Sequence, residues 1–185
     1  MPELTTADVA SYTKGRLAAE DSETARLLAA ALGAARRYCG WHVAPVITDD
    51  VVTLDGSGTT LLVLPTLRLA ELTALTEDGI DVDVSQISVS TRGLARKRPG
   101  YVGGGAGCYW TEEFGGITAT MTHGFAEAPE WESAVLSFVE RTAGGITAGR
   151  EVVGPFQFPS AAAAGSVFSD AEKMLLDLYR LEDPA

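Results

Sequence analysis

Cysteine and histidine are scarce in this sequence of 185 residues, with two of each. Two cysteines, Cys39 and Cys108, are too few for a disulfide-stapled scaffold, which is typical of proteins made in the cytosol. The first residues lack the basic and apolar regions of a signal peptide, and no apolar run is long enough to span a membrane. We therefore expect a protein made in the cytoplasm that has no association with membranes.

Basic residues are outnumbered, because 14 Lys and Arg against 25 Asp and Glu give a net charge of −11. Sequence-specific DNA binding needs a basic surface that neutralises phosphates, so this balance argues against it. An acidic surface lets DNA pass without binding, although general solubility explains the same charge. The one basic cluster contains Arg92, Arg96, Lys97 and Arg98. It is either a contact surface for nucleic acid or a neighbouring subunit, or a solvated strand edge.

Residue types that carry catalysis or bind metals are too few and too scattered to predict an enzyme. Cys39 and His42 have the C-x-x-H spacing of half a zinc site, which Cys108 and His123 could complete. Cys108 and His123 could instead act as nucleophile and base, but no helix N-terminus is predicted at Cys108 to lower its pKa. A small Cys/His-dependent hydrolase thus stays an alternative. The main prediction is a protein with no catalytic residue, no metal and no cofactor.

Hydrophobic periodicity predicts helices towards both ends of the chain and strands between them. We expect helices over about 5–15, 21–39 and 129–143, and short β segments over about 43–123. Leu72 and Leu75 also fit helical spacing, but the following turn signal favours a strand over 67–76. The predicted fold class is α+β: a small helical bundle with an inserted antiparallel β unit and a tethered C-terminal helix. This divides the chain into a core (1–142), a flexible tether (143–168) and a terminal helix (169–182).

The terminal helix has the clearest signals in the sequence. Ser169 and Glu172 have the spacing of a capping box, in which each side chain bonds the other residue's backbone N–H. Apolar residues follow at helical spacing on one face: Met174, Leu175, Leu178 and Leu181. A helix of roughly 13 residues is marginal alone in water. It must therefore bury this face, either on its own domain or on a partner.

Several short segments, in this order and spacing, resemble head-to-tail connector (adaptor) proteins of long-tailed double-stranded DNA bacteriophages. The resemblance spans nearly the whole chain. The residues that carry it are Thr5–Ala10, Arg37–Trp41, Leu62–Pro65, Thr122–Phe125 before Pro129, and Phe168–Glu172 with Leu175, Tyr179 and Arg180.

This resemblance implies a structural protein of the virion, located at the head–tail interface. About twelve copies would form a ring under the portal protein, extend the DNA channel and present a surface to the next tail-completion (stopper) protein. The resemblance implies that the C-terminal segment grips the portal through Phe168, Met174, Leu175, Leu178, Tyr179 and Leu181, with possible tether contacts at Phe156 and Phe158. Trp110 and the basic cluster are candidates for a subunit interface or a channel loop. Another tail-completion or stopper protein is the alternative within the same class.

Overall fold

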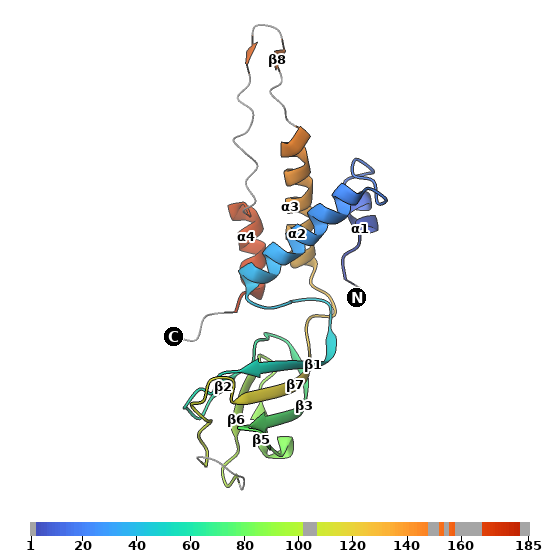
Figure 1. Cartoon of the computed structure of the whole chain (residues 1–185). Coiled ribbons are helices and arrows are strands. Elements are labelled where there is room, and N and C mark those ends of the chain that lie inside the picture. The colour runs from blue at the N-terminus through green and yellow to red at the C-terminus, as the bar shows by residue number, and fades with distance from the viewer. Residues whose placement is uncertain (1–2, 102–106, 148–151, 154–155, 158–167, 182–185) are drawn as a thin grey trace. The chain divides into compact units, whose positions relative to one another are not determined.

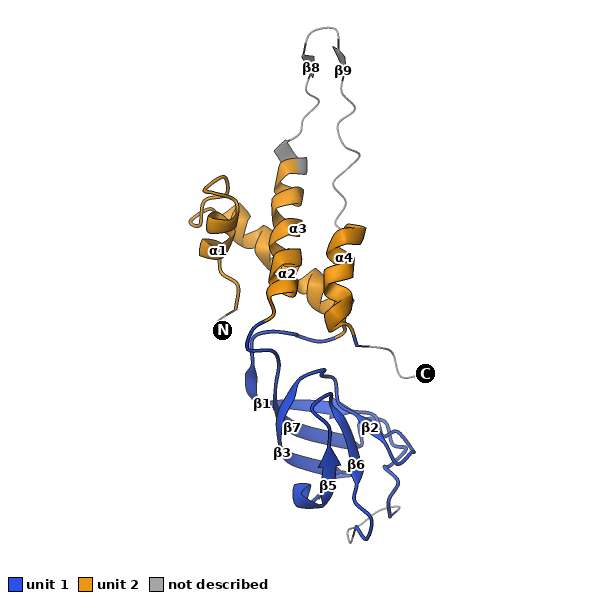
Figure 2. Ribbon diagram, turned by 180° about the vertical axis from the view of Figure 1, so that it is seen from behind, with its two compact units in different colours: residues 1, 41–127, 181–185 blue, residues 2–40, 128–180 orange. Residues whose placement is uncertain are grey.

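The computed structural model describes residues 3–101, 107–147, 152–153, 156–157 and 168–181. The chain divides into two compact units (Figure 2). The β unit consists of residues 1, 41–127 and 181–185, and the helical unit of residues 2–40 and 128–180. The mixture of helices with antiparallel sheets confirms the predicted α+β class.

Within the described residues, the helical unit contains four α-helices (Figure 1). They are α1 (Thr6–Tyr12), α2 (Ser22–Cys39), α3 (Pro129–Thr147) and α4 (Asp170–Leu176), and the 3-10 turn η2 (Asp177–Tyr179) follows α4. Capping boxes start α1, at Thr5 and Asp8, and α4, at Ser169 and Glu172; the second is the one predicted above. Gly40 ends α2 in the left-handed conformation, with φ of 80°, which glycine adopts without steric cost.

The core of this unit is formed by one face of each helix. Its buried apolar residues are Val9, Leu27, Leu28, Ala31, Leu32, Ala35, Cys39, Trp131, Ala134, Val135, Phe138, Val139, Phe168, Leu176 and Tyr179. The C-terminal segment 168–181 contributes the last three of these: Phe168 lies before α4, Leu176 ends it and Tyr179 ends η2. It therefore packs on α3 and α2 within the helical unit.

The β unit consists of two antiparallel sheets. Their strands are β1 (Ile47–Leu54), β2 (Leu62–Val63), β3 (Leu69–Glu77), β4 (Ile80–Asp81), β5 (Ile87–Val89), β6 (Leu94–Lys97) and β7 (Ile117–His123), and the 3-10 turn η1 (Val84–Gln86) precedes β5. One sheet has the order β1-β7-β3-β4 and the other β2-β6-β5. A single cluster of buried residues draws on both sheets, so their inner faces pack together (Figure 2).

Strand β3 explains why residues 67–76 also fit helical spacing. Leu69, Leu72 and Leu75 are buried at every third position, which resembles one face of a helix. The register against β7 shifts between Leu69 and Glu71 and again between Leu72 and Ala74. Each irregularity adds a residue to the strand, so the buried side chains fall three apart instead of two.

The remaining elements differ from the predicted boundaries or fall on the predicted tether. Helix α3 continues to Thr147, and the terminal helix changes to the 3-10 turn after Leu176. Strands β8 (Val152–Val153) and β9 (Phe156–Gln157) pair antiparallel within the segment expected to be a tether. Most of that segment lies outside the described residues. Within the part of the chain that is described, no helix combines the length and apolarity needed to cross a bilayer.

Candidate docking surface

Apolar side chains hold the terminal helix to the helical unit. The Phe168 ring lies against the Phe138 ring of α3, with 4.6 Å between centroids, and 6.2 Å from the Tyr38 ring of α2. Leu176 is fully buried, and the Cys39 thiol of α2 donates to its carbonyl oxygen over 3.7 Å. The terminal helix is thus held by Leu176 and by Phe168 just before it, neither of which belongs to the apolar face that the sequence predicts.

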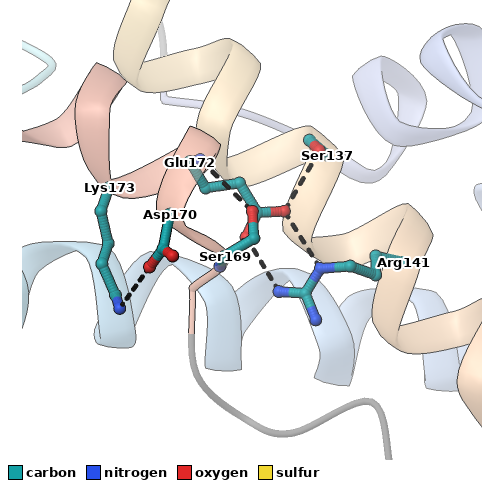
Figure 3. A network of polar contacts seen from close by, with 6 residues as sticks. All are labelled: Ser137, Arg141, Ser169, Asp170, Glu172 and Lys173. Atoms are coloured by element: carbon teal, nitrogen blue, oxygen red, sulfur yellow. Dashed lines mark hydrogen bonds and ion pairs between the residues drawn. The ribbon is translucent and has the colours of Figure 1, made fainter. Parts of the chain in front are cut away.

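Glu172 links the start of α4 to α3 through its buried carboxylate (Figure 3). The backbone N–H of Ser169 donates to it over 2.7 Å, which completes the capping box. Arg141 of α3 donates through Nη2 and Nε over 2.8 and 3.2 Å, and the Ser137 hydroxyl donates over 3.1 Å. One carboxylate therefore both caps α4 and fixes it to α3.

These contacts set the charge state of Glu172. Burial alone would raise the pKa of Glu172, but the bonds from Arg141 and Ser169 favour the ionised form and hold the pKa below its ordinary value. The ionised Glu172 carboxylate is in turn the buried anion that pairs with the Arg141 guanidinium. The carboxylate is therefore ionised at neutral pH, which is the form that accepts all of these hydrogen bonds.

Two tyrosines fix the other end of the segment. The Tyr179 hydroxyl donates to Glu130 at the start of α3 over 2.6 Å, and the Tyr38 hydroxyl donates to Asp177 over 2.7 Å. Burial and the neighbouring Glu130 carboxylate raise the pKa of Tyr179, so it remains a hydrogen-bond donor. Phe168 and Tyr179, both predicted to contact a portal, are instead buried against the helical unit.

The side of the C-terminal segment that faces away from the helical unit presents apolar side chains to solvent. Met174 is 73% exposed and Leu178 is 64% exposed, while Leu175 and Leu181 are partly buried. Met174 and Leu178 are four residues apart and so lie on one side of the segment. The predicted docking residues therefore separate into a buried set that anchors α4 and an exposed pair that is free to meet a partner.

The predicted tether contacts are less defined. Phe156 begins strand β9, whose side chains the structure does not describe. Phe158 lies outside the described residues. Both stay predictions.

The basic cluster also separates into exposed and buried members. Arg92, Arg96 and Arg98 are exposed, whereas the Lys97 side chain is buried and its ammonium lies 2.7 Å from Glu77 Oε2 and 2.7 Å from the Tyr109 carbonyl oxygen. Lys97 is thus part of the β unit's interior. The alternation of side chains along a predicted strand could have indicated this, because residues 95 and 97 share one face of β6 and residues 94 and 96 the other.

Trp110 belongs to the same interior. Its side chain is 1% exposed, and the Lys97 ammonium lies 4.8 Å from the centroid of its ring. It therefore stabilises the β unit from within and does not itself form a surface for another subunit.

The Cys/His residues of the hydrolase alternative lie in unlike surroundings. Burial, with the nearby Asp177 carboxylate, raises the pKa of Cys39 to about 12, so its thiol is not a ready nucleophile. Cys108 is exposed. His42 and His123 meet edge to face, 4.4 Å between centroids, and His123 Nε2 lies 3.0 Å from Asp50. Among the residues that the structure describes, no three His, Cys, Asp or Glu side chains are grouped to hold a metal ion.

Comparison of the whole chain with solved structures shows where this fold occurs. It matches a chain of "Virion of native gene transfer agent (GTA) particle" with a TM-score of 0.59, 16% identity, and coverage of 98% of this chain and 91% of that one. It matches a chain of "Neck of empty GTA particle computed with C6 symmetry" with a TM-score of 0.57, 18% identity and the same coverage. No family model and no curated protein matches the sequence. The chain therefore shares, over nearly its full length, the fold of proteins found in gene transfer agent virion and neck structures.

Proposed function

We propose that this chain is a structural, non-enzymatic protein of the neck of a phage-like particle, where it joins the head to the tail. The observation that carries the proposal is the match of 98% of the chain to a chain from a particle's neck. Because the match covers 98% of this chain, it includes both the helical and the β parts. The sequence resemblance to phage head–tail connectors points to the same location independently of the fold.

In this role the chain forms a ring below the portal and extends the DNA channel. Rings of six or twelve copies both fit a neck that was computed with C6 symmetry. The net charge of −11 suits a channel through which DNA slides, because like charges do not hold the phosphate backbone. A tail-completion (stopper) protein would bind the opposite side of the ring.

The exposed pair Met174 and Leu178 is the proposed portal contact. Exposed apolar side chains cost little to substitute in the free protein, but at the centre of an interface they contribute strongly to binding. Phe168, Leu176 and Tyr179 keep the segment in place so that the pair is presented on a fixed helix.

Portal binding by surface variants tests this function. The double variant Met174→Asp/Leu178→Asp is mixed with the portal protein of the same particle, and complexes are counted by electron microscopy. We expect the variant to fold normally and to bind at least roughly tenfold more weakly, because two buried charges would be unpaired. Ser133→Asp, at an exposed position on α3, is the matched control and should bind like the native chain. Unchanged binding by the double variant would remove the docking role from α4.

A further inference from the structure

The two outer faces of the β unit differ in chemistry. The inner faces of the sheets pack on each other, so the outer faces point in opposite directions. We call the outer face of β1-β7-β3-β4 the threonine face; its register-paired members are Val51, Thr53, Glu71, Ala74, Thr76, Asp81, Thr118, Thr120 and Thr122. We call the outer face of β2-β6-β5 the arginine face; its members are Val63, Ser88, Leu94, Arg96 and the adjoining Arg98.

Two carboxylates are the charged groups among the register-paired members of the threonine face. Glu71 and Asp81 are exposed, and within the described residues neither side chain forms an ion pair. Threonine hydroxyls occupy alternate positions of the central strand β7, opposite an exposed Val51 on β1, which is 62% accessible. A face with one exposed apolar side chain, short hydroxyls and free acids is suited to a polar, flat contact.

The arginine face has the opposite charge. Arg96 and Arg98 extend from the same side of β6 and its continuation, because the Arg98 N–H still donates to Gln86 across the ladder over 2.8 Å. In the part of the chain that is described, no ion pair involves either guanidinium. Beside them Leu94 and its register partner Val63 expose apolar surface. Each face thus combines apolar side chains with charges that lack a partner within the chain.

We propose that the threonine face of one copy binds the arginine face of the next, so that Arg96 and Arg98 meet Glu71 and Asp81 of a second copy. Opposite charges on opposite faces favour a head-to-tail contact, whereas each face would repel itself. Head-to-tail contacts generate rings when the rotation between copies closes. This inference rests on the proposed ring and specifies which surfaces build it.

Site-specific cross-linking of the full chain tests the contact. Val51→Cys and Leu94→Cys place one thiol on each face, in a Cys108→Ala background that removes the exposed native cysteine. Cys39 is buried and its pKa is raised, so it does not react. A short bis-maleimide is added at high protein concentration. We expect the variant with both thiols to give a ladder of multimers, and each variant with one thiol to stay monomeric.

Charge reversal then tests the chemistry of the contact. In the two-thiol background, Glu71→Lys/Asp81→Lys should reduce the ladder about tenfold, since like charges would face each other. Arg96→Glu/Arg98→Glu should do the same, and combining all four substitutions should restore the ladder. All four residues are exposed, so circular dichroism should show an unchanged fold.

Other outcomes would overturn the contact. Dimers from a single-thiol variant would show a face binding itself. A missing ladder, or one insensitive to charge reversal, would reject the pairing of these faces. Portal binding through Met174 and Leu178 is measured on different residues, so it can succeed when this contact fails, and the reverse.

Discussion

Glu172 shows at the residue scale how much a local pattern can predict. Its role as a capping residue follows from Ser169 three positions earlier, and the structure confirms it. Its bonds to Arg141 and Ser137 are not encoded locally, because these partners lie 31 and 35 residues away in the sequence. The sequence therefore predicts that α4 exists and where it starts, but not that α3 holds it.

Removing the charge of Glu172 should loosen the terminal helix. In Glu172→Gln the side chain keeps its size but no longer pairs with the Arg141 guanidinium, so we expect a loss of about 2 kcal/mol in the free energy of unfolding. Urea denaturation measures it. Asp170→Asn is the matched control on the same helix: Asp170 pairs with Lys173 but its side chain is 99% exposed, so it should cost less than about 0.5 kcal/mol. Equal losses of unfolding free energy in the two variants would show that the buried Glu172 contacts stabilise the chain no more than the exposed Asp170 pair.

The contribution of Glu172 should also depend on pH. Its pKa is lowered in the folded chain from an ordinary value of 4.5, so the folded state binds this proton more weakly than the unfolded state. The stabilisation is therefore complete above about pH 4.5 and is lost as the pH falls through the lowered pKa. The difference in unfolding free energy between the native chain and Glu172→Gln should be full at about pH 7 and shrink towards about pH 3. A difference that is constant with pH would contradict the assigned charge.

At the scale of the element, strand β6 shows that a basic cluster in the sequence can contain both exposed and buried side chains. Four basic residues within seven positions predict a charged surface, yet the alternation of the strand turns Lys97 inward. Its partner Glu77 comes from β3, 20 residues earlier, and the pairing arises only when the two sheets pack. Glu77 in turn accepts from the Thr111 N–H over 2.8 Å, so the pair also fixes the chain before β7.

Breaking this ion pair should destabilise the β unit. Lys97→Met leaves the Glu77 carboxylate buried without its cation, and we expect a loss of about 3 kcal/mol in the free energy of unfolding. Tryptophan fluorescence, to which Trp110 beside Lys97 contributes, follows the transition in urea. Arg96→Met changes the neighbouring exposed residue in the same way and should cost less than about 0.5 kcal/mol. If both variants unfold at the same urea concentration, Lys97 is not part of the core.

At the scale of the whole chain, the elements can be predicted from the sequence, but the order of the strands in the sheet cannot. Helical spacing and caps predict the helices within a few residues, and the strands between 43 and 123 are predicted in kind. The sheet order β1-β7-β3-β4 is not, because neither the pairing of β1 with β7 nor that of β3 with β7 joins strands that are consecutive in the chain. The predicted docking surface stays a prediction, and two of its residues, Phe168 and Tyr179, are buried within the helical unit. Spacing alone does not say which side of a helix its own domain covers.

The β unit should fold without the helices. Residues 41–127 form one continuous segment with its own core of residues from both sheets. We expect this fragment, expressed alone, to give a dispersed NMR spectrum and a cooperative thermal transition. Residues 2–40 alone should stay unfolded, because their helical unit also needs residues 128–180. A fragment 41–127 with a collapsed spectrum would mean that the helices are required.

The register of the β unit places its two ends together. Ile47, at the start of β1, pairs with His123 at the end of β7, and the Phe125 N–H donates to the Val43 carbonyl oxygen over 2.8 Å. A segment that enters and leaves at adjacent points can be lengthened, shortened or exchanged between lineages while the flanking helices keep their spacing. The length and sequence of the inserted β unit can thus change in evolution without altering the sequences of the helices on either side of it in the chain.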